Sequence, residues 1–402
     1  MIAPFPTAVR RIAHDLIGLV PELRRCATTA EVHRTPAYRA HRAEIEALLE
    51  GVEWDNRHHP PPPGDRPIRL ALWNIERGLN LDGILAALRD DPVLSTIDIL
   101  LVIEADIGMG RSGNRNVPRE IAEYLGFNYA FANSFWCLSK GDEGEQAHAT
   151  DNGLGLHGLA IVSRFPFRRY AAPRLVGALD YFAGLEKRLG ARRALIGDID
   201  LGDRSLAVSA IHLDVKTGPR QRAAQLAGVL EALRGFDPVP QLCGGDFNTC
   251  TYDLSSRMSL AASFLYKLIV LGLNRTVASY MVPHYHFEQP VFDVLARFGY
   301  TYREFNDLDA GTIYFDLNEL SLQLKTRTQV PDILYRWLRK RLEPWDGRVP
   351  LRLDWLAGKN VAVEGDPKGK AGGARVVAPV IANGAPARLS DHFPVVVDVR
   401  VG

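Results

Sequence analysis

The sequence has little of what would assign it to several common classes of protein. Its four cysteines, Cys26, Cys137, Cys243 and Cys250, are scattered without the spacing of a zinc site or a disulfide framework, so we interpret them as reduced thiols. Basic and acidic residues nearly balance, 48 against 47, for a net charge of +1. Without a basic excess, no overall electric field draws the chain onto nucleic acid or an anionic membrane.

Long apolar runs are also missing. The N-terminal stretch 1–25 interrupts its apolar positions with charged residues, so it lacks the continuous core of a secretory signal and predicts an amphipathic helix. The longest apolar run, 259–273, is shorter than the roughly 20 residues that span a bilayer, and it contains Lys267. We therefore expect a cytoplasmic protein. We find no internal repeat of solenoid or propeller period.

The composition that remains is typical of a folded protein, with 47% apolar and 24% charged residues. The proline run 58–67 predicts a linker, because successive prolines lack the amide donors of a helix or a central strand. We expect it to separate an N-terminal helical arm, 1–57, from a main domain, 68–402, that carries a helical insertion at about 254–345. The glycine-rich, charged segment 364–375 predicts an exposed loop.

Short apolar runs alternate with helical patterns along the main domain. The runs that predict strands are 68–74, 98–104, 157–163, 193–202, 204–213, 238–248, 352–358 and 393–401. Gly202 and Asp203 join two of these runs as an antiparallel hairpin. The segment 218–236 predicts an amphipathic helix between strands. The pattern as a whole favours mixed sheets flanked by helices, that is, an α/β sandwich.

Polar residues of the types that carry out catalysis stand at the ends of these predicted strands. A single Asp or Asn at such a place is more often a turn or a helix cap. Here the series continues along the whole domain, and strand ends are where a sheet holds reactive groups rigidly while loops admit a substrate. The series consists of Asn74, Glu76, Glu104, His212, Asp246, Asn248, Asp354, Asp391 and His392.

The motifs that contain these residues resemble those of the endonuclease/exonuclease/phosphatase superfamily of metal-dependent phosphoesterases. The resemblance runs from about residue 66 to 402 and is carried by "LWNIERG" (72–78), "DILLVIEAD" (98–106), "GLAIVSRFP" (158–166), "AIHLD" (210–214), "GGDFN" (244–248), "RLDW" (352–355) and "SDHFPV" (390–395). It implies a deoxyribonuclease-I-like fold, a four-layer α/β sandwich of two mixed sheets flanked by helices. It also implies that the motifs meet at one edge and hold magnesium or manganese there.

The chemistry of the residues supports a metal site. Mg²⁺ prefers oxygen ligands and keeps several waters, so Asn74, Glu76, Glu104 and Asp391 form a plausible open set. Such a cation neutralises phosphate oxygens and the charge that develops on a leaving group.

The remaining residues of the series have the character of catalytic groups. Asp246 can hold or deprotonate an attacking water, and Asn248 can orient that water and the phosphate. We expect Asp354 to fix the tautomer of His392 and to stabilise its imidazolium form. In families that resemble this one, water activation has been argued for either the Asp or the His, and we favour Asp246. His212 would contact a phosphoryl oxygen or assist the leaving group.

Four arginines are weaker candidates for phosphate binding. Arg192 or Arg193 would add positive charge near the reactive residues. Arg111 and Arg115 lie in an unusual glycine-rich, basic stretch, 104–116, which we interpret as a solvent-exposed loop, with a phosphate contact as the alternative.

Departures from the superfamily pattern limit what can be said of the substrate. Ile103 stands where a Gln usually precedes the metal-binding Glu. Apurinic endonucleases typically carry a Tyr where this chain has His212, so DNA-repair specificity is disfavoured. The glycine-rich stretch 151–158 fits neither a phosphate loop nor a dinucleotide motif. We interpret His157, inside it, as a structural residue.

The favoured function is hydrolysis of a phosphodiester or a phosphomonoester by an activated water. Nucleic acid is a possible but not favoured substrate, and a non-catalytic phosphate-binding adaptor on the same fold is the alternative of a different class. The motifs of a calcineurin-like metallophosphatase are missing. The segment 331–345 predicts a basic amphipathic helix that would either contact anionic lipid peripherally or pack as an ordinary helix. No obligate protein partner is evident.

Overall fold

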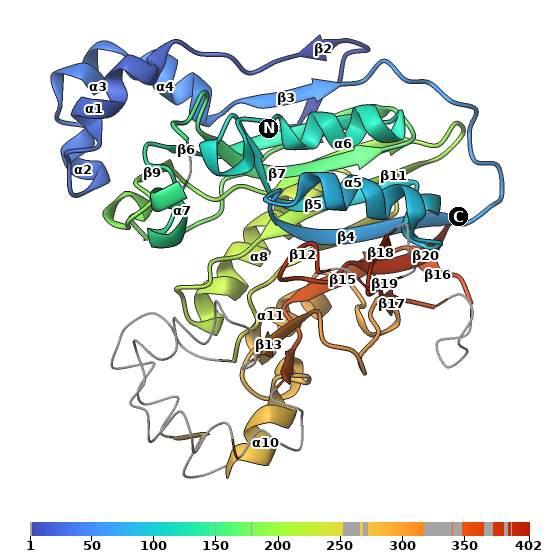
Figure 1. Cartoon of the computed structure of the whole chain (residues 1–402). Helices are drawn as coiled ribbons and strands as arrows, with labels where there is room; N and C mark the ends of the chain where they lie inside the picture. The colour runs from blue at the N-terminus through green and yellow to red at the C-terminus, as the bar shows by residue number, and fades with distance from the viewer. Residues whose placement is uncertain are drawn as a thin grey trace.

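Two large mixed β-sheets form the centre of the molecule (Figure 1). The structure is a computed structural model. It describes residues 2–148, 150–177, 179–251, 266–267, 272–316, 340, 348–365, 373–381, 385–386 and 388–402.

The first sheet has six strands in the described residues. In spatial order they are β1 (Ala3–Pro4), β8 (Phe167–Ala171), β10 (Leu195–Asp200), β11 (Ser205–His212), β12 (Gln241–Asp246) and β15 (Asp354–Lys359). Strands β11 and β12 run parallel, whereas β10 pairs antiparallel with β11 as the predicted hairpin.

The second sheet has ten strands in the part of the chain that the structure describes. Its main path is β16 (Val361–Val363), β20 (Val395–Val401), β4 (Ile68–Arg77), β5 (Ile99–Ile107), β7 (Leu156–Ser163), β6 (Asn128–Cys137), β3 (Val52–Asp55) and β2 (Val9–Arg10). Strand β17 (Arg375–Val376) adds to β20 and β9 (Arg188–Gly190) adds to β6. Strands β4 and β5 are parallel neighbours, and β20 runs antiparallel to β4.

All eight predicted strands are confirmed, as β4, β5, β7, β10, β11, β12, β15 and β20, and so is the helix at 218–236, as α8 (Pro219–Arg234). Strand β6 was not predicted. Its sequence, "NYAFANSFWC", places Asn and Ser among apolar residues and breaks the pattern of a buried run, yet every residue in it is buried. The buried side-chain nitrogen of Asn133 donates to the Leu48 carbonyl oxygen at 3.0 Å. Local polarity therefore hid a central strand.

The core divides into three apolar layers that match a four-layer sandwich. Between the sheets, side chains such as Leu101 from β5 and Leu242 from β12 pack together. Helices α5 (Leu81–Asp90) and α6 (Val117–Leu125) cover the outer face of the larger sheet (Figure 1). Helices α8 and α11 (Gln289–Arg297) cover the outer face of the smaller one. The fold is therefore the predicted helix, sheet, sheet, helix arrangement.

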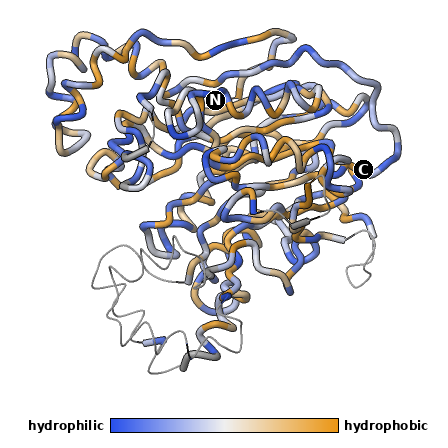
Figure 2. The backbone as a smooth tube through the Cα atoms, viewed as in Figure 1, coloured by the Kyte–Doolittle hydropathy of each residue, from blue (hydrophilic) through white to orange (hydrophobic). Residues whose placement is uncertain are grey.

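The colouring of Figure 2 is consistent with these layers. Hydrophobic segments concentrate in the stacked sheets and in the helices beside them, and hydrophilic segments gather toward the periphery. Burial of apolar surface on both faces of each sheet stabilises the fold and fixes where the strands end. Those strand ends are the positions that carry the candidate functional residues.

The N-terminal segment joins both sheets. It does carry short helices, α1 (Val20–Leu23), α2 (Thr29–Val32), α3 (Pro36–Ala40) and α4 (Arg42–Leu49), but the amphipathic helix predicted over 1–25 is wrong. Strand β1 pairs with β8, and β3 pairs with β6. Pro4 and Pro6 disfavour a helix locally, and in the folded structure Phe5 packs against the rings of Trp54 and Phe167.

The proline run 58–67 contains no helix or strand, as expected of a linker. The described part of the predicted insertion contains α10 (Gly272–Ser279), α11 and β13 (Ile313–Asp316), which pairs with β14 (Arg348–Leu351). Strands β18 (Val380–Ile381) and β19 (Ala385–Pro386) form a small hairpin. The predicted basic helix at 331–345, apart from residue 340, and most of the loop at 364–375 lie outside the described residues. The domain limits stay predictions.

Three further elements are short. Helix α7 (Glu143–His148) follows β6, and 3-10 turns at Tyr181–Ala183 and Arg303–Phe305 precede β9 and β13.

In the described part of the chain, no helix has both the length and the apolar character needed to cross a membrane.

Candidate active site

Three of the predicted catalytic residues lie in one row across the smaller sheet. His212 ends β11 and is the register partner of Asp246, which ends β12. Asp246 is in turn the register partner of Asp354, which begins β15. Because side chains on neighbouring strands at the same register project to the same side, the sheet brings an imidazole and two carboxylates together.

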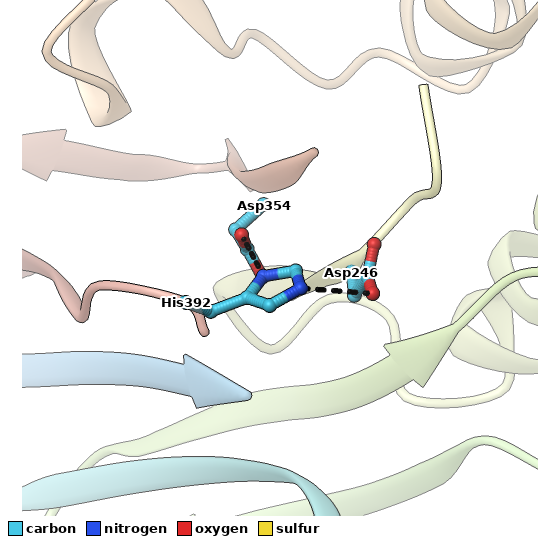
Figure 3. Close-up of side chains that lie close together, drawn as sticks. All are labelled: Asp246, Asp354 and His392. Carbon is cyan, nitrogen blue, oxygen red and sulfur yellow. Dashed lines mark hydrogen bonds and ion pairs between the residues drawn. The ribbon is translucent and has the colours of Figure 1, made fainter. Parts of the chain in front are cut away.

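His392 reaches this row from the segment before β20. Its Nδ1 lies 2.7 Å from Oδ2 of Asp354, and its Nε2 lies 3.9 Å from Oδ2 of Asp246 (Figure 3). The imidazole therefore stands between the two carboxylates, hydrogen-bonded to one and facing the other. The predicted pairing of His392 with Asp354 is present in the structure.

Both members of this pair are held by their backbones. The indole nitrogen of Trp73, in β4, donates to the carbonyl oxygen of His392 at 3.0 Å. The amide nitrogen of Asp354 donates to Oγ1 of Thr312 at 3.2 Å. Ser390 donates to the carbonyl oxygen of Asn74 at 2.7 Å, which ties the segment before β20 to the end of β4. The hydrogen bond between His392 and Asp354 then joins the segment before β20 to the smaller sheet.

Asp246 is positioned by two asparagines. The side chain of Asn74 donates to Oδ2 of Asp246 at 3.2 Å, and the backbone amide of Asn248 donates to Oδ1 at 2.9 Å. The side-chain amide of Asn248 donates to the carbonyl oxygen of Leu213 at 2.8 Å, so its orientation is fixed. The backbone of Asn248 therefore holds Asp246, while its side chain is itself held by Leu213.

Close packing of neighbouring strands explains why glycines precede Asp246. A Cβ atom on Gly245 would collide with the backbone of Ile211 on the parallel neighbour β11. Gly244 is less restricted, since a Cβ there would meet the side chain of Leu356 on β15, which can shift more easily than backbone. The close approach of these three strands is what brings His212, Asp246 and Asp354 into one row.

Three residues of the site have left-handed backbone conformations that non-glycine residues seldom adopt. The φ angles are +47° for Glu76, +59° for Glu104 and +50° for Asn248. The pairing of β4 and β5 shifts register between Asn74 and Arg77, so the strands bulge where the acidic side chains leave the sheet. Such backbone strain is commonly found at functional sites, where the surrounding structure enforces it.

The predicted metal ligands lie at the same edge of the sandwich. The amide nitrogen of Asp391 donates to Oε2 of Glu76 at 3.1 Å, and that of Glu76 donates to Oδ1 of Asn74 at 3.1 Å. Oε1 of Glu104 lies 3.9 Å from Nε2 of His212. Hydrogen bonds or short contacts thus connect each of these residues to the rest of the site.

The donor set fits a hard divalent cation. Burial raises the pKa of Glu76, and the negative charges of Asp391 and Glu104 raise it further. This crowding of carboxylates is what a cation would relieve. In the described residues these three acids do not form a closed cluster of ligand atoms, and an open set of this kind suits Mg²⁺, which keeps several waters.

The tightest cluster of potential ligand atoms in the described residues is a different one. Atoms of Asp246, Asp354 and His392 lie within 4.8 Å of one another. Since Nδ1 of His392 is already hydrogen-bonded to Asp354, we interpret this cluster as a hydrogen-bonded chain rather than as a ligand shell.

The pKa values of the histidines and of Asp246 at this site are strongly shifted from their usual values. Burial alone would lower the pKa of His392, but the charge of Asp354 and its hydrogen bond raise that pKa well above the usual value. Burial, together with the charge of Asp354, raises the pKa of the Asp246 carboxyl. Burial lowers the pKa of His212 well below its usual value, and the charge of Arg192 contributes. The site therefore favours a charged His392 beside a neutral His212.

The four candidate arginines have different surroundings. Arg192 is at the site: its Nε lies 2.9 Å from Oδ1 of Asp214, and its positive charge lowers the pKa of Glu104. Arg193 is not available to a substrate, because its guanidinium donates to the carbonyl oxygens of Leu49, Gly51, Asn133 and Ala172.

The interpretation of Arg111 as part of an exposed loop is wrong. Its side chain is 1% exposed, and its Nε pairs with Oδ2 of Asp106 at 2.7 Å. Arg115 is partly exposed and pairs with Asp82 and Glu120 on helices α5 and α6. Both arginines are therefore paired with carboxylates of the protein, and neither is placed to contact a phosphate in this structure.

Several residues near the site were not predicted as functional. Arg77, directly after Glu76, lies 3.8 Å from Oε2 of Glu104, and its positive charge lowers the pKa of that acid against the effect of burial. Arg188 acts on Glu104 in the same direction. Asp214 lies two positions after His212, beyond the end of β11, and pairs with Arg192. An acid this close to the end of a predicted strand is a signal that the sequence does contain.

The sequence matches the profile of the Endonuclease/Exonuclease/phosphatase family over residues 71–392, which is most of the chain and spans every site residue described above. The chain belongs to this family. The two mixed sheets, the flanking helices and the edge where the motifs meet agree with that membership. A comparison with curated proteins finds no match.

Among solved structures, the catalytic domain of human nocturnin with bound sulfate is 14% identical, with 87% of this chain and 97% of that chain covered and a TM-score of 0.43. The mannosyl-6-phosphatase Bt3783 of Bacteroides thetaiotaomicron is 13% identical, with 83% and 99% covered and a TM-score of 0.42. TDP2 of D. rerio in complex with a single-strand DNA product is 12% identical, with 83% and 99% covered and a TM-score of 0.41.

Proposed function

We propose that the protein is a divalent-metal-dependent phosphoesterase that hydrolyses a phosphodiester or a phosphomonoester by attack of an activated water. The observation that carries the proposal is the chain from Asp354 through His392 to Asp246, with separations of 2.7 and 3.9 Å. This arrangement places the charged imidazole of His392, a hydrogen-bond donor, beside the basic carboxylate of Asp246.

Asp246 is the favoured base. Its raised pKa makes the ionised carboxylate a better proton acceptor than an exposed Asp. Asn74 and the backbone of Asn248 fix both of its oxygens, so the carboxylate is held in position for a water molecule.

His392 is the favoured phosphate contact. With Nδ1 donating to Asp354, a protonated ring presents its Nε2–H toward Asp246 and the space beside it. A buried imidazolium stabilises the negative charge that builds up on the phosphoryl oxygens. His212 is a neutral ring on the other side of Asp246, at 3.4 Å from its Oδ2, where it is suited to the leaving group.

Magnesium or manganese would be held by Glu104, Asp391, Asn74 and Glu76. When bound, the cation neutralises phosphate oxygens and the charge on the leaving group. The residues around it do the positioning: Arg77 and Arg192 keep Glu104 ionised, since their charges lower its pKa.

The charge balance of the protein narrows the class of substrate that we propose. Net charge is +1, and the arginines nearest the site are matched by acids, for example Arg77 by Glu145 and Arg111 by Asp106. This balance favours a compact phosphate ester over a long nucleic acid, whose binding depends on neutralising many phosphates. A nuclease remains the second candidate within the family, and peripheral contact with a membrane through 331–345 stays a prediction.

A metal-dependent activity screen tests the proposal. Purified protein is stripped with EDTA and assayed with Mg²⁺, Mn²⁺ or no metal on a phosphodiester, a phosphomonoester, a phospholipid and single-stranded DNA and RNA. We expect hydrolysis of a small ester with Mg²⁺ or Mn²⁺ and none after EDTA treatment. Full activity in metal-free protein would contradict the metal dependence.

Two variants make the screen specific to this site. Asp246→Asn removes the base while keeping the shape of the side chain, and Glu123→Gln, an exposed acid on α6, is the matched control. We expect the first to be inactive and the second to equal the wild type. If a metal-loaded, folded wild type hydrolysed none of these substrates and still bound phosphate, the non-catalytic adaptor would be favoured.

A further inference from the structure

One buried threonine contacts the backbone on both sides of the Asp354–His392 pair. Thr312 lies directly before β13 and is fully buried. Its Oγ1 accepts hydrogen bonds from the amide nitrogens of Leu353, at 3.1 Å, and of Asp354, at 3.2 Å. Its carbonyl oxygen accepts from the amide nitrogen of Phe393 at 2.7 Å. Thr312 thus joins the residue that begins β15 to the residue that follows His392.

The hydroxyl of Thr312 supplies an acceptor where the pairing of β13 with β14 ends. That pairing extends to Leu351, whose carbonyl oxygen accepts from the amide of Thr312 at 2.9 Å. Beyond Leu351 the chain leaves β14 and enters β15 at Asp354. The residues Leu353 and Asp354 are buried, so their amides need acceptors within the protein. A hydroxyl oxygen has two lone pairs and can serve both amides.

The carboxylate of Asp354 depends on its backbone for its position. Its Oδ2 lies 2.7 Å from Nδ1 of His392 (Figure 3), whereas its Oδ1 is buried and has no hydrogen-bond partner in the described part of the chain. By contrast, both oxygens of Asp246 accept hydrogen bonds, one from Asn74 and one from the amide of Asn248. Since no second donor among the described residues orients the Asp354 carboxylate, a shift of its backbone would move it relative to His392.

Two other hydrogen bonds each hold one side of the pair. The indole of Trp73 donates to the carbonyl oxygen of His392, and the amide of Phe247 donates to that of Leu353 at 2.8 Å. The first ties His392 to the larger sheet, and the second ties Leu353 to the smaller sheet. Thr312 contacts both segments, so it controls how far apart the imidazole and the carboxylate are held.

We infer that Thr312 is a positioning residue for catalysis, whose hydroxyl and carbonyl oxygens together set the separation of Asp354 and His392. It acts through His392 rather than on the substrate. The inference rests on the proposed function and adds to it a residue outside the predicted motifs. Its effect on the rate should be large, because a displacement of catalytic groups by about 1 Å can cost about a hundredfold.

Two substitutions separate the hydroxyl of Thr312 from its shape. Thr312→Val nearly keeps the shape and removes the acceptor, whereas Thr312→Ser keeps the acceptor and removes a methyl group. On the best substrate of the metal-dependent screen, we expect kcat of Thr312→Val to fall about ten- to a hundredfold with KM changed less than about threefold, because the lost interaction acts in the transition state. Thr312→Ser should keep kcat near that of the wild type.

Thr35→Val is the matched control for lost stability. Oγ1 of Thr35 also accepts a backbone amide, that of Tyr38 at 3.1 Å, but it does so at the N-terminus of α3. Both valine variants should lower the melting temperature, since each leaves a backbone amide without its acceptor. Only Thr312→Val should lower kcat. In the His392→Ala background it should lower kcat no further, because the two residues act as one unit.

Crystal structures of the wild type, Thr312→Val and Thr312→Ser make the test independent of activity. We expect Nδ1 of His392 and Oδ2 of Asp354 to separate beyond about 3.2 Å, the usual limit of such a hydrogen bond, in the valine variant and to stay bonded in the serine variant. If Thr312→Val does not fold, as judged by its melting curve, Thr312→Cys replaces it with the same expectations, since a thiol is a weak acceptor.

The outcomes separate this inference from the proposed function. A kcat of folded Thr312→Val equal to that of the wild type, or an equal loss in Thr312→Ser, would overturn the inference and leave the proposed function intact. A further fall in kcat in the His392→Ala background, or an unchanged separation of Asp354 and His392 in the valine variant, would do the same. If the wild type hydrolysed none of the substrates, the proposed function would fail, and the separations measured in the crystal structures would decide the inference.

Discussion

The imidazole of His392 and the carboxylate of Asp354 form a buried hydrogen-bonded pair, with Nδ1 and Oδ2 2.7 Å apart. Asp354 raises the pKa of His392 against the effect of burial, so the pair holds a positive charge next to Asp246. Breaking it from either side should therefore have the same consequence for catalysis.

We expect His392→Ala and Asp354→Asn each to lower kcat by about a hundredfold or more, and the double variant to be little worse than either. Groups that act as one unit show such non-additivity, whereas independent contributors multiply their losses. Turnover is measured with melting temperature on all three variants. Multiplicative losses in folded protein would show that the two residues act separately.

Asp391 and His392 are neighbours in sequence with different expected tasks, so they can be separated. Asp391→Ala should weaken metal binding, and raising the Mg²⁺ concentration should restore much of its activity. His392→Ala should not respond to added metal. The measurement is a titration of activity with Mg²⁺ for both variants, and rescue of His392→Ala would contradict the assignment.

Arg192 and Arg193 provide a matched pair on adjacent positions. Arg192→Ala should lower activity about tenfold or more with a modest change in stability, because its side chain faces Glu104 and Asp214. Arg193→Ala should chiefly lower stability, since the carbonyl oxygens it serves lose a charged donor, at about 1–3 kcal/mol for each group left unsatisfied. Urea unfolding and turnover of both variants check this. The opposite pattern would exchange their roles.

The loss of folding stability at acid pH should depend on the buried ion pairs beside the site. Burial would raise the pKa of Glu186, but the charges of Arg188, Arg111 and Arg77 lower it to about 2. A carboxyl with a lowered folded pKa stabilises the protein above its unfolded value, about 4.3, and that stability is lost as the pH falls from there toward about 2.

Glu186→Gln should therefore flatten the fall in melting temperature within this pH window, at the expense of stability near neutral pH. The exposed acid Glu123, changed to Gln, is the control and should leave the acid limb as it is. Differential scanning calorimetry across the window makes the comparison. An unchanged acid limb in Glu186→Gln would mean that other groups dominate acid unfolding.

Salt dependence should report the size of the substrate. For a compact phosphate ester we expect KM to change less than tenfold between about 50 and about 200 mM salt, whereas an enzyme that makes six or more contacts to a nucleic-acid backbone loses about a thousandfold in affinity. Measuring kcat/KM on the best substrate of the screen at several salt concentrations distinguishes these cases. A steep dependence would favour the nuclease.

The sequence by itself determined two local features: where most strands and the helix α8 lie, and which motif residues are candidates for the site. Alternating and continuous apolar runs marked eight strands and the helix α8, because burial imposes a period on the chain that survives without the structure. Motifs such as "GGDFN" and "SDHFPV" predicted Asp246 and His392 as catalytic residues, since each of them follows or precedes such a run.

Only the tertiary structure decided which of these residues meet and which do not. His212, Asp246 and Asp354 become one row through the registers of three strands that are distant in sequence, and the sequence does not encode a register locally. Adjacent arginines diverge for the same reason, with Arg192 at the site and Arg193 bound to backbone carbonyls.

The same limit explains the errors. Pro4, Pro6 and the contacts of Phe5 override a helical pattern at the N-terminus. The polar strand β6 is central because distant residues contact its polar side chains, as when Asn133 donates to the Leu48 carbonyl oxygen. Arg111 lies in a glycine-rich stretch that suggests an exposed loop, yet its guanidinium is buried against Asp106 of β5. A charge can be buried only where another part of the chain brings its partner, and the partner's position is a property of the folded structure.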